Sequence, residues 1–255
     1  MNEEVLTTIN RMRAVTISRE YGSGGGEIAA RLAKRLGWQL IDHAIVERVA
    51  SELGTSLEEA EEHDESSDGI ISQILNSMRN IYPVNTDTVP PEAFLSSEAY
   101  RWTVEKIIGA AASRGHVVIV GRASQVILSD RRDVLHVRII ALFEQRVTAV
   151  MQREGLDRHS AEVRICHKDH ERAGYLEREY HHKPDEAQLY NLVLKTSLLN
   201  LESAVDIICF TLDEIACPRR DESGWALTRA LLTSSLERTN NKKYEPRYTL
   251  CPATI

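Results

Sequence analysis

The run of small residues from Gly22 to Gly26 has the composition of an anion-binding loop. It lies between an apolar stretch and an amphipathic stretch. The preceding residues 13–18 predict a strand, and the pattern over 25–36 predicts a helix. Glycines placed between a strand and a helix let backbone N–H groups converge on an anion, and the helix N-terminus adds about half a positive charge. We therefore predict that this loop binds phosphate groups through five residues: Gly22, Ser23, Gly24, Gly25 and Gly26.

Two nucleotide-binding templates compete for this loop, and neither fits completely. Gly22, Gly24 and Asp42 have the spacing of a dinucleotide-binding turn followed by an acid, but Glu27 occupies the place of the third glycine. The mononucleotide template G-x-x-x-x-G-K-[ST] fits the glycines loosely and lacks both its lysine and its hydroxyl. Gly26 and Glu27 stand where such a loop normally has its cation.

A second basic group lies in the stretch "EVRICHKDHERAGYLEREYHHK". Arg164, Lys168 and Arg172 are spaced four residues apart and share one face of the predicted helix. They either form ion pairs with neighbours such as Glu171 and Asp169 on a solvated helix, or they bind an anion. Phosphoryl transfer requires several fixed cations, because charge and positioning do nearly all the catalytic work, whereas hydride transfer does not. The cluster therefore favours phosphoryl transfer.

Further charged residues allow less specific interpretations. Arg146 and Arg153 lie two turns apart on a predicted helix that follows a strand, so they either face the active site or form a solvated surface. Four histidines have metal-binding chemistry, but no carboxylate or cysteine spacing supports a metal site, and a solvated helix end is the better interpretation. These histidines are His167, His170, His181 and His182. No metal ligand is assigned.

The predicted elements alternate between strands and helices. The strands are 13–18, 38–42, 116–120, 134–141 and 189–196. The helices are 25–36, 43–53, 57–63, 69–80, 96–113, 143–154, 158–181 with Asp157 as its N-cap, and 201–213, while 82–94 is a loop. This order predicts a three-layer α/β/α fold with a parallel central sheet of about five strands. Ligands of such sheets bind beyond the carboxyl ends of the strands, where Arg19 to Gly26, Asp42, Gly121-Arg122 and Thr196 fall.

Composition narrows the classes of partner. The chain has 255 residues and a net charge of −7, which argues against a general nucleic-acid or membrane-surface binder. Its longest apolar runs are of strand length, and its N-terminus lacks the pattern of a secretory signal. The four cysteines show no C-x-x-C spacing, so we expect free thiols in a reducing compartment, the cytoplasm.

Six segments together resemble the cytidylate kinase-like family, relatives of bacterial cytidylate kinase. They are "VTISREYGSGGGEIA", "LIDHAIVERVA", "VVIVGRAS", "HVRIIA", "RVTAVMQREGLDRHSAE" and "KDHERAGYLEREY", in order between residue 13 and about residue 210. The resemblance implies a nucleoside-monophosphate kinase fold of the P-loop kinase type, with a core sheet, a helical nucleoside-monophosphate-binding segment and a lid. The expected domains are 13–212, the kinase-like domain, and 213–255, an extension without an assigned role.

The resemblance also implies roles for individual residues. Gly22 to Gly26 would hold the donor phosphates. Asp42 and His43 match a pair near the acceptor nucleotide, and Arg122 matches an arginine that holds the acceptor phosphate. On the lid helix, Asp169 would face the base, while Arg172 and the adjacent Lys168 would act on the transferred phosphoryl group as the catalytic residues. The family pattern is broken by the missing loop lysine and by Val120, which replaces an aspartate.

The expected activity is phosphorylation of a nucleoside monophosphate, CMP or dCMP first, with ATP and Mg²⁺. The missing lysine and carboxylate favour an alternative, in which a nucleotide-binding regulatory domain has kept the fold and lost the chemistry. A dinucleotide-dependent oxidoreductase is a third interpretation. The acceptor base and the oligomeric state are not determined by the sequence.

Overall fold

The structure is a computed structural model that describes residues 12–46, 49, 73–74 and 97–216. All of the described residues belong to one unit of the chain, 1–216. Most of the three predicted helices between 43 and 80, the loop 82–94 and the extension beyond residue 216 lie outside the described residues, so these predictions stay open. Within the described part, no helix is long and apolar enough to cross a membrane.

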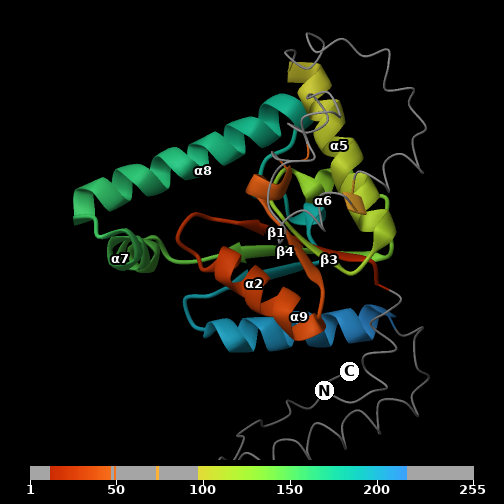
Figure 1. The fold of residues 1–255 in the computed structure, drawn as a ribbon. Coiled ribbons are helices and arrows are strands. Elements are labelled where there is room, and N and C mark those ends of the chain that lie inside the picture. The colour runs from red at the N-terminus through yellow and green to blue at the C-terminus, as the bar shows by residue number, and fades with distance from the viewer. Residues whose placement is uncertain (1–11, 47–48, 50–72, 75–96, 217–255) are drawn as a thin grey trace, which may run out of the picture. The chain divides into compact units, whose positions relative to one another are not determined.

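Five parallel strands form a single sheet in the order β2-β3-β1-β4-β5. The predicted three-layer fold with five strands is thereby confirmed (Figure 1). The strands are β1 Ala14–Arg19, β2 Gln39–Ile41, β3 Val117–Val120, β4 Val134–Ile140 and β5 Leu192–Lys195. Each crossover from one strand to the next passes through at least one helix, as parallel pairing requires.

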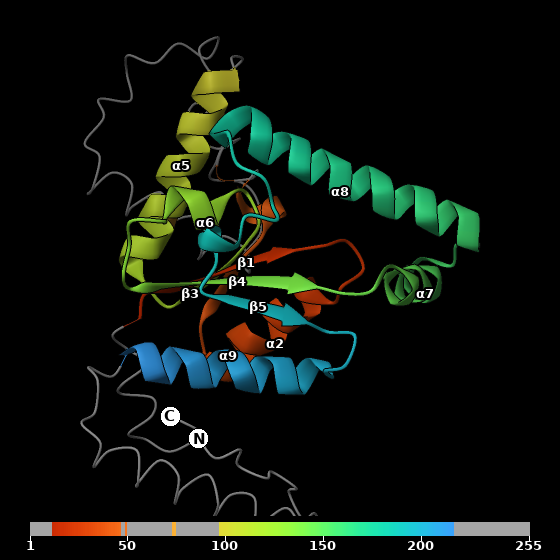
Figure 2. The same ribbon diagram turned by 180° about the vertical axis from the view of Figure 1, so that it is seen from behind.

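The strands are apolar because helices cover both faces of the sheet. Central strand β1 pairs with β3 and β4, and Val117 to Val120 of β3 are buried throughout. One core contains Val15, Ile17 and alternate residues of β3 and β4. Helices α2 (Gly25–Leu36) and α9 (Leu201–Ala216) cover this core. Helices α5 (Ser97–Arg114) and α6 (Ser124–Ile127) pack on the opposite face (Figures 1 and 2).

Helix α2 begins directly after the glycine loop and positions that loop over the sheet. Its buried residues include Ile28, Leu32 and Leu36, which form the predicted apolar stripe. Gly37 ends the helix in the left-handed conformation at φ 67°, and its N–H bonds to carbonyls of the last turn. The predicted helix 25–36 is therefore confirmed at both ends.

Helices α7 (Phe143–Glu154) and α8 (Arg158–Tyr180) follow β4, and α8 reaches from α7 to α5 (Figure 2). Asp157 caps α8 as predicted, because its carboxylate accepts the Ser160 N–H at 2.9 Å. At the other end of α8, the Arg101 guanidinium of α5 donates to the Glu179 carbonyl at 3.1 Å.

Two predicted boundaries differ from the structure by three residues, whereas the other boundaries of the described strands and long helices agree within one. The strand expected over 189–196 is shorter, because Ala187–Leu189 form a 3₁₀ turn before β5 begins at Leu192. The helix expected over 201–213 continues to Ala216, since Leu212 and Ala216 extend its buried stripe.

Candidate functional site

A cavity of about 910 Å³ lies beside the carboxyl ends of β1 and β3 and below the middle of α8. Its wall includes Ser18 to Tyr21, Val120 to Ala123, and Lys168 to Ala173. Basic side chains from five elements or loops surround it. They are Arg19, His43, Arg122, Arg138, Lys168 and Arg172.

Arg122 enters the cavity from an unusual stretch of backbone. Gly121, Arg122 and Ala123 have φ values of 77°, 54° and 54°, and non-glycine residues rarely adopt this left-handed conformation. Such strain persists only where the surroundings enforce it, and it clusters at functional sites. The Arg122 Nη2 lies 2.6 Å from His43 Nε2, and the guanidinium lies over the Tyr100 ring at 5.8 Å. The strained turn thus joins two predicted acceptor-site residues, His43 and Arg122.

The three basic residues predicted to share one face of α8 are all close to acids, so the ion-pair alternative holds in part. Arg164 pairs with Glu154 at 2.9 Å and lies outside the cavity wall. Lys168 bonds to Glu171 at 2.8 Å, and both side chains are about half exposed.

Arg172 differs from its two neighbours on α8. Its Nη1 donates to the Arg19 carbonyl at 3.2 Å and lies 4.0 Å from the Asp169 carboxylate. Its guanidinium stacks on the Tyr21 ring at 5.3 Å, and burial lowers its pKa. Arg172 is therefore docked against the segment that precedes the glycine loop.

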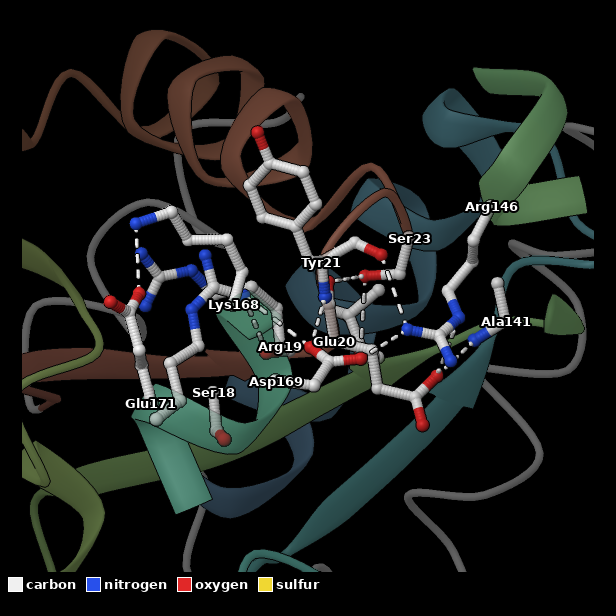
Figure 3. A network of polar contacts seen from close by, with 12 residues as sticks. Ser18, Arg19, Glu20, Tyr21, Ser23, Ala141, Arg146, Lys168, Asp169 and Glu171 are labelled. Carbon is white, nitrogen blue, oxygen red and sulfur yellow. Dashed lines mark hydrogen bonds and ion pairs between the residues drawn. The ribbon is translucent and has the colours of Figure 1, made fainter. Parts of the chain in front are cut away.

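Arg146 corrects one interpretation of the sequence, because it does not belong to a solvated helix face. It is 8% exposed, and its Nη1 bonds to Asp169 at 2.5 Å and to the Tyr21 carbonyl at 3.2 Å. Its Nε lies 3.6 Å from the Glu20 carboxylate (Figure 3). Arg153, by contrast, is about half exposed and pairs with Glu154. Arg146 thus links α7, α8 and the loop segment.

Asp169 and Asp42, two predicted substrate-binding acids, are both engaged with the protein. Asp169 accepts the Tyr21 N–H at 2.7 Å in addition to its ion pair with Arg146 (Figure 3). Asp42 accepts the Ile45 N–H at 3.1 Å and does not line the cavity. Asp169 lines the cavity wall, but both of its oxygens already have partners.

The glycine loop lies next to the cavity, and none of Gly22 to Gly26 lines it. The Ser23 hydroxyl is turned inward, where it donates to the Glu20 carbonyl at 2.9 Å and approaches the Ile139 carbonyl at 3.3 Å. Gly24 is the N-cap of the 12-residue helix α2 and adopts φ 81°. As at the start of any α-helix, the first N–H groups of α2 have no acceptors within the helix. These N–H groups are the donors through which the loop is predicted to bind phosphate.

Within the part of the chain that the structure describes, no group of three or more His, Cys, Asp or Glu side chains could hold a metal ion. The Ser23 hydroxyl is occupied by backbone carbonyls. Any Mg²⁺ in this site would rely on the phosphate oxygens of the nucleotide, as this ion often does.

Arg19 is a cavity residue for which the sequence predicts only a place at the ligand edge of the sheet. Its side chain is half-buried at the end of β1 and lines the cavity. Burial first, and then the charges of Arg172 and Arg122, lower its pKa to about 10, although Asp42 acts in the opposite direction. The only sequence signal was its position directly before the glycine loop.

The chain is similar to several solved structures and to a segment of one curated protein. An uncharacterized protein from Eubacterium ventriosum superimposes with a TM-score of 0.59 and 23% identity, covering 80% of this chain and 99% of that one. A shikimate kinase from Bacteroides thetaiotaomicron reaches a TM-score of 0.43 and 10% identity over 79% of this chain and 99% of its own, which is too distant to bear on the chemistry here.

A uronate isomerase from Corynebacterium glutamicum is 28% identical over 116 residues, or 46% of this chain. The matched segment spans only 22% of the length of that enzyme.

The family comparison covers far more of the chain. Residues 14–198 match the cytidylate kinase-like family. The match begins at the first residue of β1 and ends beyond β5, so it includes every strand of the sheet and all the residues of the cavity wall. The chain therefore belongs to the cytidylate kinase-like family.

Proposed function

We propose that the protein transfers a phosphoryl group from ATP to a nucleoside monophosphate, with CMP or dCMP as the first candidate acceptor. Family membership supports the class of reaction, and the cationic cavity beside a glycine loop supports its location. The cavity and the glycine loop both lie at the carboxyl edge of the parallel sheet, which is where ligands of such sheets bind.

The observation that carries the proposal is the convergence of Arg19, Arg122 and Arg172 on one cavity. They come from the end of β1, the turn after β3 and the middle of α8. In a chain of net charge −7, three guanidinium groups from separate elements form a local exception. Phosphoryl transfer depends on such fixed cations around the moving group, so the arrangement suits this reaction.

Roles follow from position. The backbone of Gly24 to Gly26 at the start of α2 would bind the donor phosphates. Arg122 would bind the acceptor phosphate, held in place by His43 and Tyr100. Arg172 and Lys168 would stabilise negative charge on the transferred group from the lid helix α8. Mg²⁺ would enter bound to the ATP phosphates and would supply further positive charge there.

A specific observation also supports the alternative of a nucleotide-binding domain without turnover. Asp169, expected to face the acceptor base, has both carboxylate oxygens bonded to Arg146 and to the Tyr21 N–H. Base recognition by Asp169 would require one of these bonds to break. This engagement and the missing loop lysine are the two observations that support the alternative.

A panel of nucleoside monophosphates with Mg²⁺·ATP separates these functions. ADP formation in a coupled assay that depends on one acceptor is the expected result, and calorimetry with the same nucleotides reports binding independently. Saturable nucleotide binding without ADP would support the non-catalytic alternative. Binding of NAD without binding of ATP would instead indicate the oxidoreductase.

A further inference from the structure

The side chain of Arg19 occupies space that two glycines leave open. A Cβ atom added at Gly25 would lie 2.6 Å from the Arg19 Cβ, and one added at Gly121 would lie 2.1 Å from the Arg19 Nη1. Both distances are far below ordinary contact. The stem of Arg19 therefore passes the first residue of α2, and its guanidinium lies against the turn that holds Arg122.

This arrangement leaves no room for a lysine at Gly25, the first residue of α2. Any side chain at Gly25 would collide with the Arg19 stem, whereas a Cβ at Gly26 would meet nothing within 4 Å. The loop residues Gly22 to Gly26 carry no cation of their own, so a cation beside them in this protein comes from another element. Arg19 comes from the last residue of β1, three positions before Gly22.

The Arg19 guanidinium is not neutralised by a direct partner among the described residues. No hydrogen bond or ion pair joins it to another side chain of the described ranges, whereas Arg146, Arg164 and Lys168 each bond to a carboxylate. Burial and the charges of Arg172 and Arg122 destabilise the charged form of Arg19. They lower its pKa to about 10, although the charge of Asp42 acts in the opposite direction. An anion between these guanidinium groups would relieve both effects.

We propose that Arg19 supplies the cation that the glycine loop lacks, by binding phosphate oxygens of the nucleotide between the loop and Arg122. This inference rests on the proposed function for the identity of the ligand, but it stands for any polyphosphate. A guanidinium binds phosphate through two parallel N–H bonds, so Arg19 contacts the ligand directly and is a binding residue.

Three proteins test the assignment: the wild type, Arg19→Gln and Arg158→Gln. Arg158→Gln is the control, because it changes the net charge by the same amount as Arg19→Gln. Arg158 is more than half exposed, pairs with Glu144 and Glu162, and lies outside the cavity wall. Calorimetry with inorganic triphosphate should show binding weakened at least about tenfold in Arg19→Gln, the scale of a lost charged hydrogen bond, and unchanged in Arg158→Gln.

A second measurement uses the wild type alone and does not depend on how the variant folds. Phenylglyoxal modifies accessible arginines, and peptide mass spectrometry reports each site. Triphosphate should protect Arg19 from modification and leave Arg158 unprotected. Equal modification of Arg19 with and without triphosphate, or wild-type affinity in a folded Arg19→Gln variant, would overturn the assignment.

The outcomes separate this inference from the proposed function. Loss of triphosphate binding in Arg19→Gln, in a protein that forms no nucleoside diphosphate, would support Arg19 and reject the kinase activity. Nucleoside diphosphate formation together with wild-type triphosphate binding in Arg19→Gln would support the activity and reject Arg19.

Discussion

At the scale of single residues, arginines of the same chemistry serve opposite purposes according to their neighbours. The Arg146 guanidinium lies near the carboxylates of Glu20 and Asp169 and donates to the Tyr21 carbonyl, so its charge is compensated within the protein. Arg172 donates to the Arg19 carbonyl, and its charge lowers the pKa of Arg19 in addition to the larger effect of burial. Charge that the protein leaves uncompensated is available to an anionic ligand.

Substitution of Arg172 tests the catalytic role of the lid helix. Arg172→Ala should lower turnover roughly 10²-fold or more, the effect of removing one preorganised charge-stabilising group. Arg172→Lys should recover only part of this loss, because an ammonium group cannot bind phosphate in two places at once. Steady-state kinetics with Mg²⁺·ATP measures both.

Arg164→Ala is the matched control, since Arg164 lies on the same helix outside the cavity and pairs with Glu154. Its turnover should equal that of the wild type. Equal losses in Arg164→Ala and Arg172→Ala would mean that α8 acts through its overall charge, and the specific role of Arg172 would be rejected.

Gly26 offers a gain of function. Gly26→Arg adds a cation at the start of α2 where a Cβ meets nothing within 4 Å, so we expect tighter ATP binding. A new charge-assisted hydrogen bond is worth about 1.5–3 kcal/mol at best. The neighbouring Glu27 already pairs with Arg31, which leaves the new side chain available.

Calorimetry with ATP compares this variant with Gly26→Ala, which changes helix propensity alone. If both variants bind ATP as the wild type does, the loop does not need a further cation there. That result would be consistent with Arg19 already providing it.

At the scale of elements, helix α8 is fixed to the rest of the protein at several points. Its start is capped by Asp157, its middle is joined to α7 and the loop segment through Asp169 and Arg146, and its end contacts Arg101 of α5. Tyr21 adds a further link, because its hydroxyl donates to Glu154 of α7 at 2.6 Å. A lid helix held in this way must exchange some of these bonds if it moves on nucleotide binding.

Arg146→Met tests this attachment. The substitution keeps much of the buried stem and removes the charge, leaving Glu20 and Asp169 without their partner. Breaking a buried ion pair costs about 3–5 kcal/mol, and we expect the lower end because both acids retain some solvent contact. Denaturant unfolding should therefore show a loss of roughly 3 kcal/mol. Arg153→Met, at an exposed ion pair on the same helix, should change stability by less than about 1 kcal/mol; comparable losses would contradict the attachment.

The elements themselves were largely predictable because their signals are local. Ile28, Leu32 and Leu36 define the face of α2, and glycines mark both of its ends. The 3₁₀ turn before β5 was missed, since a short apolar run does not distinguish a turn from a strand end. The sequence leaves two alternatives open for Arg146, because its partners Glu20 and Asp169 come from segments more than 20 residues away in sequence. Family resemblance brought His43, Arg122, Lys168, Asp169 and Arg172 to one site, but the direction of each side chain depends on tertiary contacts.

At the scale of the whole molecule, the central sheet contains a titratable residue, His136, in its core. His136 of β4 lies opposite Thr16 of β1, and its Nδ1 is 2.8 Å from the threonine hydroxyl. Burial lowers the pKa of His136 below its ordinary value of 6.5. The unfolded chain therefore takes up a proton at this histidine at a pH where the folded protein does not.

Stability should consequently fall as the pH drops below about 6.5, by at most about 1.4 kcal/mol per pH unit for this one proton. Urea unfolding at pH 5 to 8 measures the effect. His136→Gln should reduce the slope, whereas His159→Gln, at an exposed position on α8, should keep it. An unchanged slope in His136→Gln would show that other groups cause the pH dependence.

The most direct test of the central claim follows the phosphoryl group itself. Phosphorus NMR of the wild type with Mg²⁺·ATP and the preferred nucleoside monophosphate should show ADP and the acceptor's diphosphate forming in equal amounts. The Arg172→Ala variant should form both much more slowly. Release of inorganic phosphate without any acceptor diphosphate, or unchanged ATP despite saturable nucleotide binding, would contradict phosphoryl transfer to a nucleoside monophosphate.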